Sequence, residues 1–247
     1  MEQHNQLLIN KINAYRPSDE AIEIVQATPL LTLSGIAGAG KDTVGNRLLQ
    51  TGKYHRIISH TTRVPRTNNG VQEVNGVDYH FVDPVTAEHM IDKRGFVEVK
   101  GVHTKIYGTS VGEFVLARDE GKIAIAEIDV QGADEYVRLN PRTRAVFLIP
   151  PDPNTWLLRL KNRYQDDWRA HRDDILIRFA SAQRELGHVA NSPHYHLVIN
   201  RTMEETVQIV RSIAEEGSDF SQNKVARASI ADILGFLASS QSVEALE

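Results

Sequence analysis

The feature that most constrains this chain is a glycine-rich turn within residues 30–43, which read L-L-T-L-S-G-I-A-G-A-G-K-D-T. A short apolar run precedes Gly35, and a helical pattern of apolar residues follows Thr43. Glycines allow positive φ and let backbone N–H groups approach an anion, and the following helix N-terminus adds partial positive charge. Lys41 is placed to reach the β- and γ-phosphates of a nucleotide. The stretch therefore predicts a strand, a phosphate-binding loop and a helix.

Asp42 departs from the usual pattern of such loops, G-x-x-x-x-G-K-[ST]. It stands where Ser or Thr is expected, and Thr43 follows one place later. A carboxylate repels a triphosphate unless a cation lies between them. We therefore expect Asp42 to hold Mg²⁺, directly or through water. The alternative, a glycine-rich turn with a chance lysine, does not explain why strand, glycines, lysine and helix coincide.

Composition excludes several classes of function. The chain has 247 residues and no cysteine, so disulfides, thiol catalysis and Cys-based zinc sites are excluded. Its net charge of −4 gives no indication of a nucleic-acid or membrane surface, and its ten histidines lack metal-ligand spacing. No apolar run is long enough to cross a bilayer, and the N-terminus lacks a signal pattern. A cytoplasmic location is expected.

Hydrophobic periodicity predicts alternating strands and helices. Besides the strand before Gly35, strands are expected at 56–59, 77–82, 96–100, 104–109, 123–130, 145–149 and 196–200, and helices at 84–93, 111–120, 154–164, 173–188 and 202–214. The near-continuous apolar run at 123–130 is typical of a strand buried on both faces of a parallel sheet. Residues 1–28 are expected to form a helical extension that packs on the rest or makes an oligomer contact. Residues 217–247 are expected to form a linker and a terminal helix.

Two arginines follow the second predicted strand. Arg63 and Arg66 lie three apart around a proline, so they can converge on one phosphate, although a solvated basic turn has the same pattern. A small β-rich excursion then carries Tyr79, Glu98 and Tyr107.

Further polar residues lie at the predicted carboxyl end of the buried strand and near its downstream helices. Glu127 and Asp129 end the apolar run, where ligands bind in open α/β sheets. Arg159, Arg163 and Arg178 flank the charged segment 164–172. We interpret that segment as a mobile cover and the arginines as a clamp on a transferring phosphoryl group.

Five motifs in order complete the pattern: G-x-x-G-x-G-K-x-T, S-x-T-T-R-x-P-R, V-D-Y-H-F, an isolated Glu nine before the Tyr of Y-G-T, and D-V-Q-G. From residue 30 to about 215 the chain resembles the guanylate kinases, which move a phosphoryl group from ATP to GMP. The resemblance implies a P-loop three-layer α/β/α fold with a parallel central sheet, within a domain at 29–216. It also implies a small β-rich GMP-binding lobe at about 60–110 and a lid at about 163–173.

The resemblance also assigns roles to residues. ATP would be bound by Gly35, Ile36, Ala37, Gly38, Ala39, Gly40, Lys41, Asp42, Thr43 and Asn200. GMP would be bound by Ser59, Arg63, Arg66, Tyr79, Glu98, Tyr107, Thr109, Glu127 and Asp129. Catalysis would rest on Lys41, Arg63, Arg159, Arg163 and Arg178. Glu98 can accept from both N1–H and the exocyclic amino group of guanine, a donor pair that adenine lacks. Mg²⁺, ATP and GMP or dGMP are the implied ligands, and a homodimer stays open.

The chain departs from the family pattern at several places. Glu127 stands where Asp is usual, Trp168 is unexpected, and the loops after Arg66 and Arg163 are longer. Two alternatives remain. Ribose 1,5-bisphosphate kinases resemble this group and can carry G-K-D-S, but they are not expected to keep the guanine-reading set. Non-catalytic guanylate-kinase-like modules usually lose the intact phosphate loop, which is present here.

Overall fold

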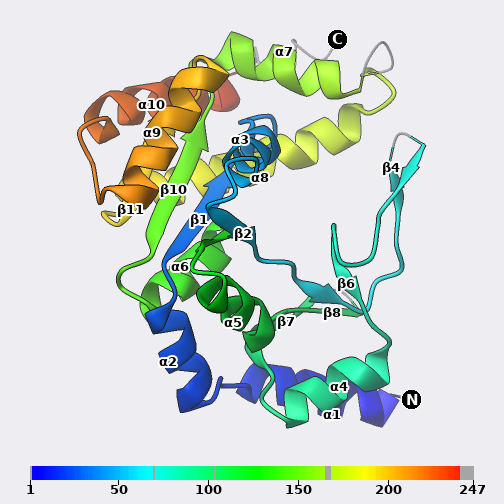
Figure 1. Ribbon diagram of the computed structural model, residues 1–247. Coiled ribbons are helices and arrows are strands. Elements are labelled where there is room, and N and C mark those ends of the chain that lie inside the picture. Colours follow the sequence, from blue (N-terminus) through cyan, green and yellow to red (C-terminus); the bar gives the residue numbers. More distant parts are fainter. Residues whose placement is uncertain (1, 69, 103, 165–167, 240–247) are drawn as a thin grey trace. The chain divides into compact units, whose positions relative to one another are not determined.

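The computed structural model describes residues 2–68, 70–102, 104–164 and 168–239, except the side chains of residues 2–7 and 68 (Figure 1). The chain falls into two compact units, one formed by residues 1–30 and 53–126 and the other by residues 31–52 and 127–247. The division into 1–28, 29–216 and 217–247 stays a prediction. No described helix has both the length and the apolar character that a membrane span needs.

A five-stranded sheet has the strand order β11-β10-β1-β9-β2. Its strands are β1 (Leu30–Gly35), β2 (Tyr54–Arg56), β9 (Ile123–Glu127), β10 (Arg144–Ile149) and β11 (Tyr195–Ile199). The pairings of β1 with β10, β10 with β11 and β2 with β9 are all parallel. The predicted α/β fold with a parallel central sheet is therefore confirmed.

The second unit surrounds β1, β10 and β11, which are almost fully buried, with helices. These helices are α3 (Lys41–Leu49), α6 (Val130–Leu139), α7 (Pro153–Arg163), α8 (Arg172–Asn191), α9 (Met203–Glu215) and α10 (Asn223–Ala238). The terminal helix α10 contacts α8 and β11. The Asn223 side chain fixes its start, because it accepts from Leu197 N at 2.9 Å and donates to Tyr195 O at 2.8 Å.

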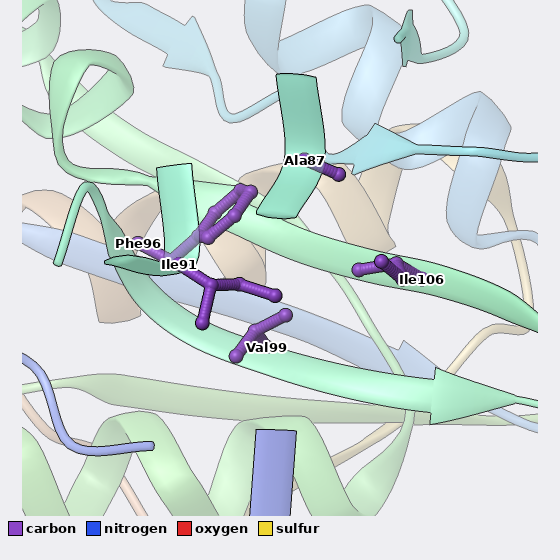
Figure 2. Close-up of a cluster of buried hydrophobic side chains, with 5 residues drawn as sticks. All are labelled: Ala87, Ile91, Phe96, Val99 and Ile106. Carbon is purple, nitrogen blue, oxygen red and sulfur yellow. The ribbon is translucent and has the colours of Figure 1, made fainter. Parts of the chain in front are cut away.

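The first unit holds a separate four-stranded sheet in the order β6-β3-β8-β7. These strands are β3 (His60–Thr61), β6 (His80–Phe81), β7 (Phe96–Val102) and β8 (Lys105–Ser110). The unit also contains α1 (Glu2–Ala14), α2 (Asp19–Ala27), α4 (Pro84–Asp92), α5 (Val111–Asp119) and the hairpin of β4 (Thr67–Asn68) and β5 (Val71–Gln72). Figure 2 shows the buried cluster of its sheet and α4: Ala87, Ile91, Phe96, Val99 and Ile106.

Three strand predictions were wrong in extent, each for a local reason. The strand expected at 56–59 lies instead at 54–56 (β2), residues 57–59 are not part of a strand, and the Glu113 carboxylate accepts from Ile58 N at 2.9 Å. The strand expected at 77–82 covers only 80–81, because the Asp78 side chain accepts from Val74 N at 2.7 Å and closes a turn. The strand expected at 123–130 ends at 127, because Asp129 already caps the next helix.

Replacement of Gly108 by Ala should destabilise the first unit. A Cβ at Gly108 would lie 2.8 Å from Glu98 O and 3.0 Å from the Phe96 ring. Such overpacking costs about 1–3 kcal/mol of the free energy of unfolding, measurable by urea denaturation. Gly187→Ala is the matched control, because a Cβ built there on helix α8 would meet no atom of the described residues within 4 Å, apart from its chain neighbours and the helix's own backbone. The Gly187→Ala change should raise the free energy of unfolding by about 0.5–1 kcal/mol. Equal stability of the two variants would contradict the close packing at Gly108.

Candidate functional site

The turn between β1 and α3 has the backbone that a phosphate-binding loop requires. Gly38 and Gly40 have φ of 81° and 95°, a region that glycine adopts without strain. A Cβ on Gly40 would also lie 2.4 Å from Asn200 Nδ2, so no side chain fits there. Gly40 caps the N-terminus of α3 without a side-chain hydrogen bond, and Lys41 begins the helix. The turn therefore presents a helix N-terminus, with its partial positive charge, to a ligand.

Three side chains hold the loop by its carbonyl oxygens. The Trp156 indole donates to Ala37 O at 2.7 Å, the Asn200 amide donates to Ala39 O at 2.7 Å, and the Lys41 ammonium donates to Gly35 O at 2.8 Å. Trp156 is fully buried and Asn200 is 3% exposed. Because these carbonyls are bonded to the protein, the peptide groups are held in fixed orientations before any anion arrives.

A cavity of about 730 Å³ lies over this loop within the second unit. It gathers the predicted loop residues with the predicted arginines and acids. Its lining includes Gly35, Ala37, Gly38, Gly40, Lys41, Asp42, Thr43, Glu127, Asp129, Arg159, Arg163, Arg178 and Glu185. Ile36 and Ala39 are fully buried beneath the loop. Opposite charges thus line one cavity, which suits a polyanion that arrives with a cation.

Two of the predicted clamp arginines are held by the protein. Arg159 donates to Asn200 O at 3.0 Å, and burial lowers its pKa. Arg178 pairs with Asp174 at 3.0 Å, and its Nε donates to Tyr164 Oη at 2.6 Å. The Tyr164 hydroxyl also bonds to Asp174. These bonds orient both guanidinium groups in the cavity wall.

Arg163 is the third predicted clamp residue, and it is exposed at the end of α7. Part of the predicted lid at 163–173, residues 165–167, lies outside the described residues. On the last turn of α7, the Lys161 ammonium lies 3.8 Å from the centroid of the Trp168 ring, an arrangement that favours cation–π attraction. The lid function stays a prediction.

The predicted acids occupy distinct places. Asp42 is exposed on the first turn of α3. Glu127 lies over Gly45, where a Cβ would meet its Oε1 at 2.4 Å. Asp129 caps α6, because its carboxylate accepts from Gly132 N at 2.8 Å. Sequence reasoning assigned Asp129 to an acceptor nucleotide and missed this structural bond, which occupies one carboxylate oxygen.

Glu185 is a cavity residue that sequence reasoning missed. It lies half-buried on α8. Burial raises its pKa, and the nearby Lys41 ammonium partly offsets that effect. Only the tertiary structure reveals it, since in sequence it is an ordinary glutamate on a helix.

In the first unit, Arg63 forms a buried ion pair. Its two terminal nitrogens donate to Glu73 at 2.7 and 3.0 Å, and the Arg63 side chain is 8% exposed. Glu73 also accepts from Arg66 N at 2.8 Å, while Arg66 itself is exposed. The hydrogen bonds from Arg63 lower the pKa of Glu73. Glu73 therefore fixes the guanidinium that was predicted to bind a phosphate.

Sequence reasoning also missed Glu73. The signal was present: it is the one charged residue within 67–76, the polar loop that follows the two arginines. A lone carboxylate beside two predicted phosphate-binding cations is a candidate partner for them.

Two tyrosines flank Arg63. Its guanidinium carbon lies 5.2 Å from the centroid of the Tyr79 ring, and the Tyr79 and Tyr107 ring centroids lie 6.1 Å apart. Burial raises the pKa of Tyr79, so its hydroxyl stays protonated. Arg63, Tyr79 and Tyr107, which the resemblance assigns together to GMP, thus lie close to one another.

A second cluster lies on the same sheet. Thr109 Oγ1 donates to Glu98 Oε1 at 2.7 Å, and Ser59 Oγ lies 3.3 Å from Thr109 Oγ1. Glu98 is 7% exposed. Glu98 pairs across from Thr109, and Tyr107 lies two residues before Thr109 on β8, so these side chains share one face of the sheet. The face combines a carboxylate with hydroxyl and cationic groups.

The second unit has the features of P-loop nucleotide-binding proteins: a parallel sheet, a glycine loop between β1 and α3, and a cavity with lysine and arginines. Such a loop and cavity are typical of sites for the phosphates of a nucleotide.

Comparison with known proteins identifies the family. A family model described as guanylate kinase matches residues 27–217. Guanylate kinase of Caldanaerobacter subterraneus is 34% identical over 186 residues, covering 74% of this chain and 85% of the relative. Guanylate kinase of Nitrosomonas europaea is 35% identical over 190 residues, covering 75% and 88%. The chain belongs to the guanylate kinase family.

A solved structure supports the fold. The crystal structure of guanylate kinase from Anaplasma phagocytophilum superposes with a TM-score of 0.56 at 24% identity, covering 85% of this chain and 94% of that one.

Replacement of Trp156 by Phe should weaken nucleotide binding. The change removes the bond to Ala37 O and keeps an aromatic ring in the buried site. The loss of one hydrogen bond predicts a Kd for Mg·ATP about 5–10-fold higher, measured by isothermal titration calorimetry. Tyr195→Phe is the control, because it removes a buried hydroxyl bonded to Val130 O and Asp134. An unchanged Kd in Trp156→Phe would show that the indole does not hold the loop for binding.

Proposed function

We propose that this chain transfers the γ-phosphoryl group of ATP to GMP, giving ADP and GDP. The observation that carries this proposal is the buried carboxylate of Glu98, held by Thr109 on the sheet face that also bears Tyr107, whose ring is next to Tyr79, which in turn is next to Arg63. A carboxylate on such a face can accept from the N1–H and amino donors of guanine. The names of the relatives support the same reaction.

The donor side would rest on the loop and the cavity. The backbone of Gly35 to Thr43 and the Lys41 ammonium would bind the ATP phosphates, with Asn200 close to the base. Arg159, Arg163 and Arg178 would stabilise the charge that spreads over the transferred group. Arg159 and Arg178 are already oriented by hydrogen bonds.

On the acceptor side, one cluster of side chains would bind the phosphate of GMP and another would bind the base. Arg63, Arg66, Tyr79 and Tyr107 would bind the GMP phosphate. A guanidinium has five N–H groups, and the bonds from Arg63 to Glu73 and Val64 use three of them. Arg63 also interacts with the Tyr79 and Tyr107 hydroxyls, so a phosphate would share the remaining donors with these hydroxyls, with Arg63 kept in place by Glu73. Ser59, Glu98 and Thr109 would read the base.

Magnesium would be held by few protein ligands. Among the described residues, no group of three or more His, Asp or Glu side chains is arranged to hold a metal. Mg²⁺ commonly uses one or two carboxylates together with phosphate oxygens and water, so the acidic cavity lining fits the ion. The exposed Asp42 carboxylate at the start of α3 is the proposed ligand, directly or through water. The ion would neutralise charge on the transferred phosphoryl group.

One observation favours a second acceptor. The G-K-D-T sequence at Asp42 is close to the G-K-D-S of ribose 1,5-bisphosphate kinases. The Ser59, Thr109 and Glu98 cluster argues for guanine, and the intact loop argues against a non-catalytic binding module. A cytoplasmic location and a homodimer remain predictions.

A coupled ADP-release assay tests the acceptor. ATP and Mg²⁺ are combined with GMP, dGMP, AMP or ribose 1,5-bisphosphate, and GMP and dGMP should give the highest kcat/KM. Equal use of AMP would exclude guanine recognition. Preference for ribose 1,5-bisphosphate would establish the alternative acceptor, and no ADP release would support a binding module.

Glu98→Gln should lose guanine selectivity and keep the fold. Gln replaces one acceptor oxygen with a donor group, so one guanine donor loses its charged partner. The KM for GMP should rise about 10–100-fold, while circular dichroism stays unchanged. Glu120→Gln, the same change at an exposed residue of the first unit, should leave the KM unaltered. If the Glu98→Gln variant kept the wild-type ratio of kcat/KM for GMP to kcat/KM for AMP, the role of Glu98 would be refuted.

Asp42 variants test the magnesium assignment. Asp42→Ser supplies the hydroxyl of the usual loop pattern, so turnover should be kept or improved. Asp42→Asn removes the charge, so the Mg²⁺ concentration for half-maximal rate should rise about 10-fold in a titration at fixed ATP. Full activity of Asp42→Asn at limiting Mg²⁺ would show that the carboxylate has no such role.

A further inference from the structure

Helix α1 lies outside residues 27–217, the part that matches the family, yet it packs on the sheet that carries Glu98. In Figure 1, α1 lies beside α4 in the first unit, and α1 also contacts β7. Leu8 and Ile12 pack against the cluster of Figure 2. The Lys11 ammonium binds Glu88 and Asp92 of α4, each at 2.9 Å. The helix is thus tied to the sheet by apolar and ionic contacts.

The residue that follows α1 makes a more specific contact. The Tyr15 hydroxyl donates to Phe96 O at 2.5 Å and accepts from Phe96 N at 3.0 Å. One side chain therefore bonds both backbone polar groups of a single strand residue. Burial raises the pKa of Tyr15, so the hydroxyl keeps the proton that it needs to donate.

Phe96 occupies a position in the sheet that needs such a partner. Strand β7 is at the edge of the order β6-β3-β8-β7, so within the described part of the chain no further strand of this sheet lies beyond it. Phe96 pairs with Ser110 and Glu98 pairs with Thr109, so two steps on β7 match one step on β8. This is a β-bulge with Val97 as the extra residue, and a bulge loses regular ladder bonds and redirects the side chains beside it.

The bulge determines where the Glu98 carboxylate lies. Successive strand residues point to opposite faces, so a slip of one residue on β7 would turn Glu98 away from Thr109 and Tyr107. The Phe96 ring is fully buried against Gly108, which pairs with Val99. The position of Phe96 therefore fixes that of Glu98, two residues later.

We propose that Tyr15 is a positioning residue for the acceptor base, which holds the bulge at Phe96 in the register that presents Glu98 to guanine. This inference rests on the proposed function. It gives the segment before the family region a part in substrate recognition. A role limited to covering the sheet edge, or to contact between copies, would not require both hydrogen bonds to one residue.

The test compares full-length wild type with Tyr15→Phe, which removes the hydroxyl and keeps the ring. With two hydrogen bonds lost, the KM for GMP in the ADP-release assay should rise about 5–20-fold. The KM for ATP should stay within about twofold, because the ATP loop belongs to the other unit. The GMP/AMP ratio of kcat/KM should fall. Hydrogen exchange at the Phe96 amide should become faster, since Tyr15 is its partner.

Two variants separate positioning from general stability. Lys11→Ala breaks the ion pairs to α4 and keeps Tyr15, so the KM for GMP should stay at the wild-type value. Tyr195→Phe removes a doubly bonded hydroxyl from the other unit and should also leave this KM unchanged.

The outcomes distinguish the two claims. If wild type phosphorylates GMP and Tyr15→Phe raises its KM no more than the two controls do, the positioning role is overturned. If Tyr15→Phe raises the KM for ATP and GMP equally, the hydroxyl serves stability alone and the inference also fails. If wild type does not phosphorylate GMP, the proposed function fails first, and the inference falls with it.

Discussion

The fixed backbone of the loop between β1 and α3 is the constraint on which the rest of the second unit depends. A polyphosphate is bound by N–H groups that must point outward together, and peptide groups that rotate freely would lose that alignment. Trp156 and Asn200 prevent such rotation by bonding the carbonyls of Ala37 and Ala39. Both anchors lie far along the chain, on α7 and just after β11. Residues from distant parts of the unit therefore orient a few peptide groups of the loop. The charges that line the cavity would then act on a ligand that these peptide groups have already positioned.

The first unit meets a different requirement, because it buries charged side chains that must stay charged and keep a fixed orientation. Arg63 is buried and is tolerated there because Glu73 pairs with it. Glu98 is buried beside Thr109, which supplies a hydrogen bond to one oxygen. Each buried charge thus has a partner that fixes its direction. The edge strand carrying Glu98 has its own support, since Tyr15 and α1 cover it.

Most elements could be predicted from local sequence, and the failures share a cause. The alternating pattern located the strands around Glu98 and Tyr107 because hydrophobic periodicity is a local property. It failed at residues 57–59, where the Glu113 side chain accepts from Ile58 N, and at 77–79, where Val77 N and Asp78 N bond Val74 O in a turn. Glu185 was missed as a site residue because the folded chain alone brings Lys41 close to it. Glu73 was missed although its place in the sequence, shortly after Arg63 and Arg66, was a local signal.

The sequence by itself determined the phosphate-binding loop, the α/β class and the family, because glycine spacing, apolar runs and motif order are written in consecutive residues. Only the tertiary structure decided which carbonyls are anchored, which charges are paired, and that the segment before the family region reaches the strand that carries Glu98. These features depend on bonds between residues such as Tyr15 and Phe96, 81 positions apart. No local pattern records such a bond, since its energy exists only when packing brings the two groups within about 3 Å.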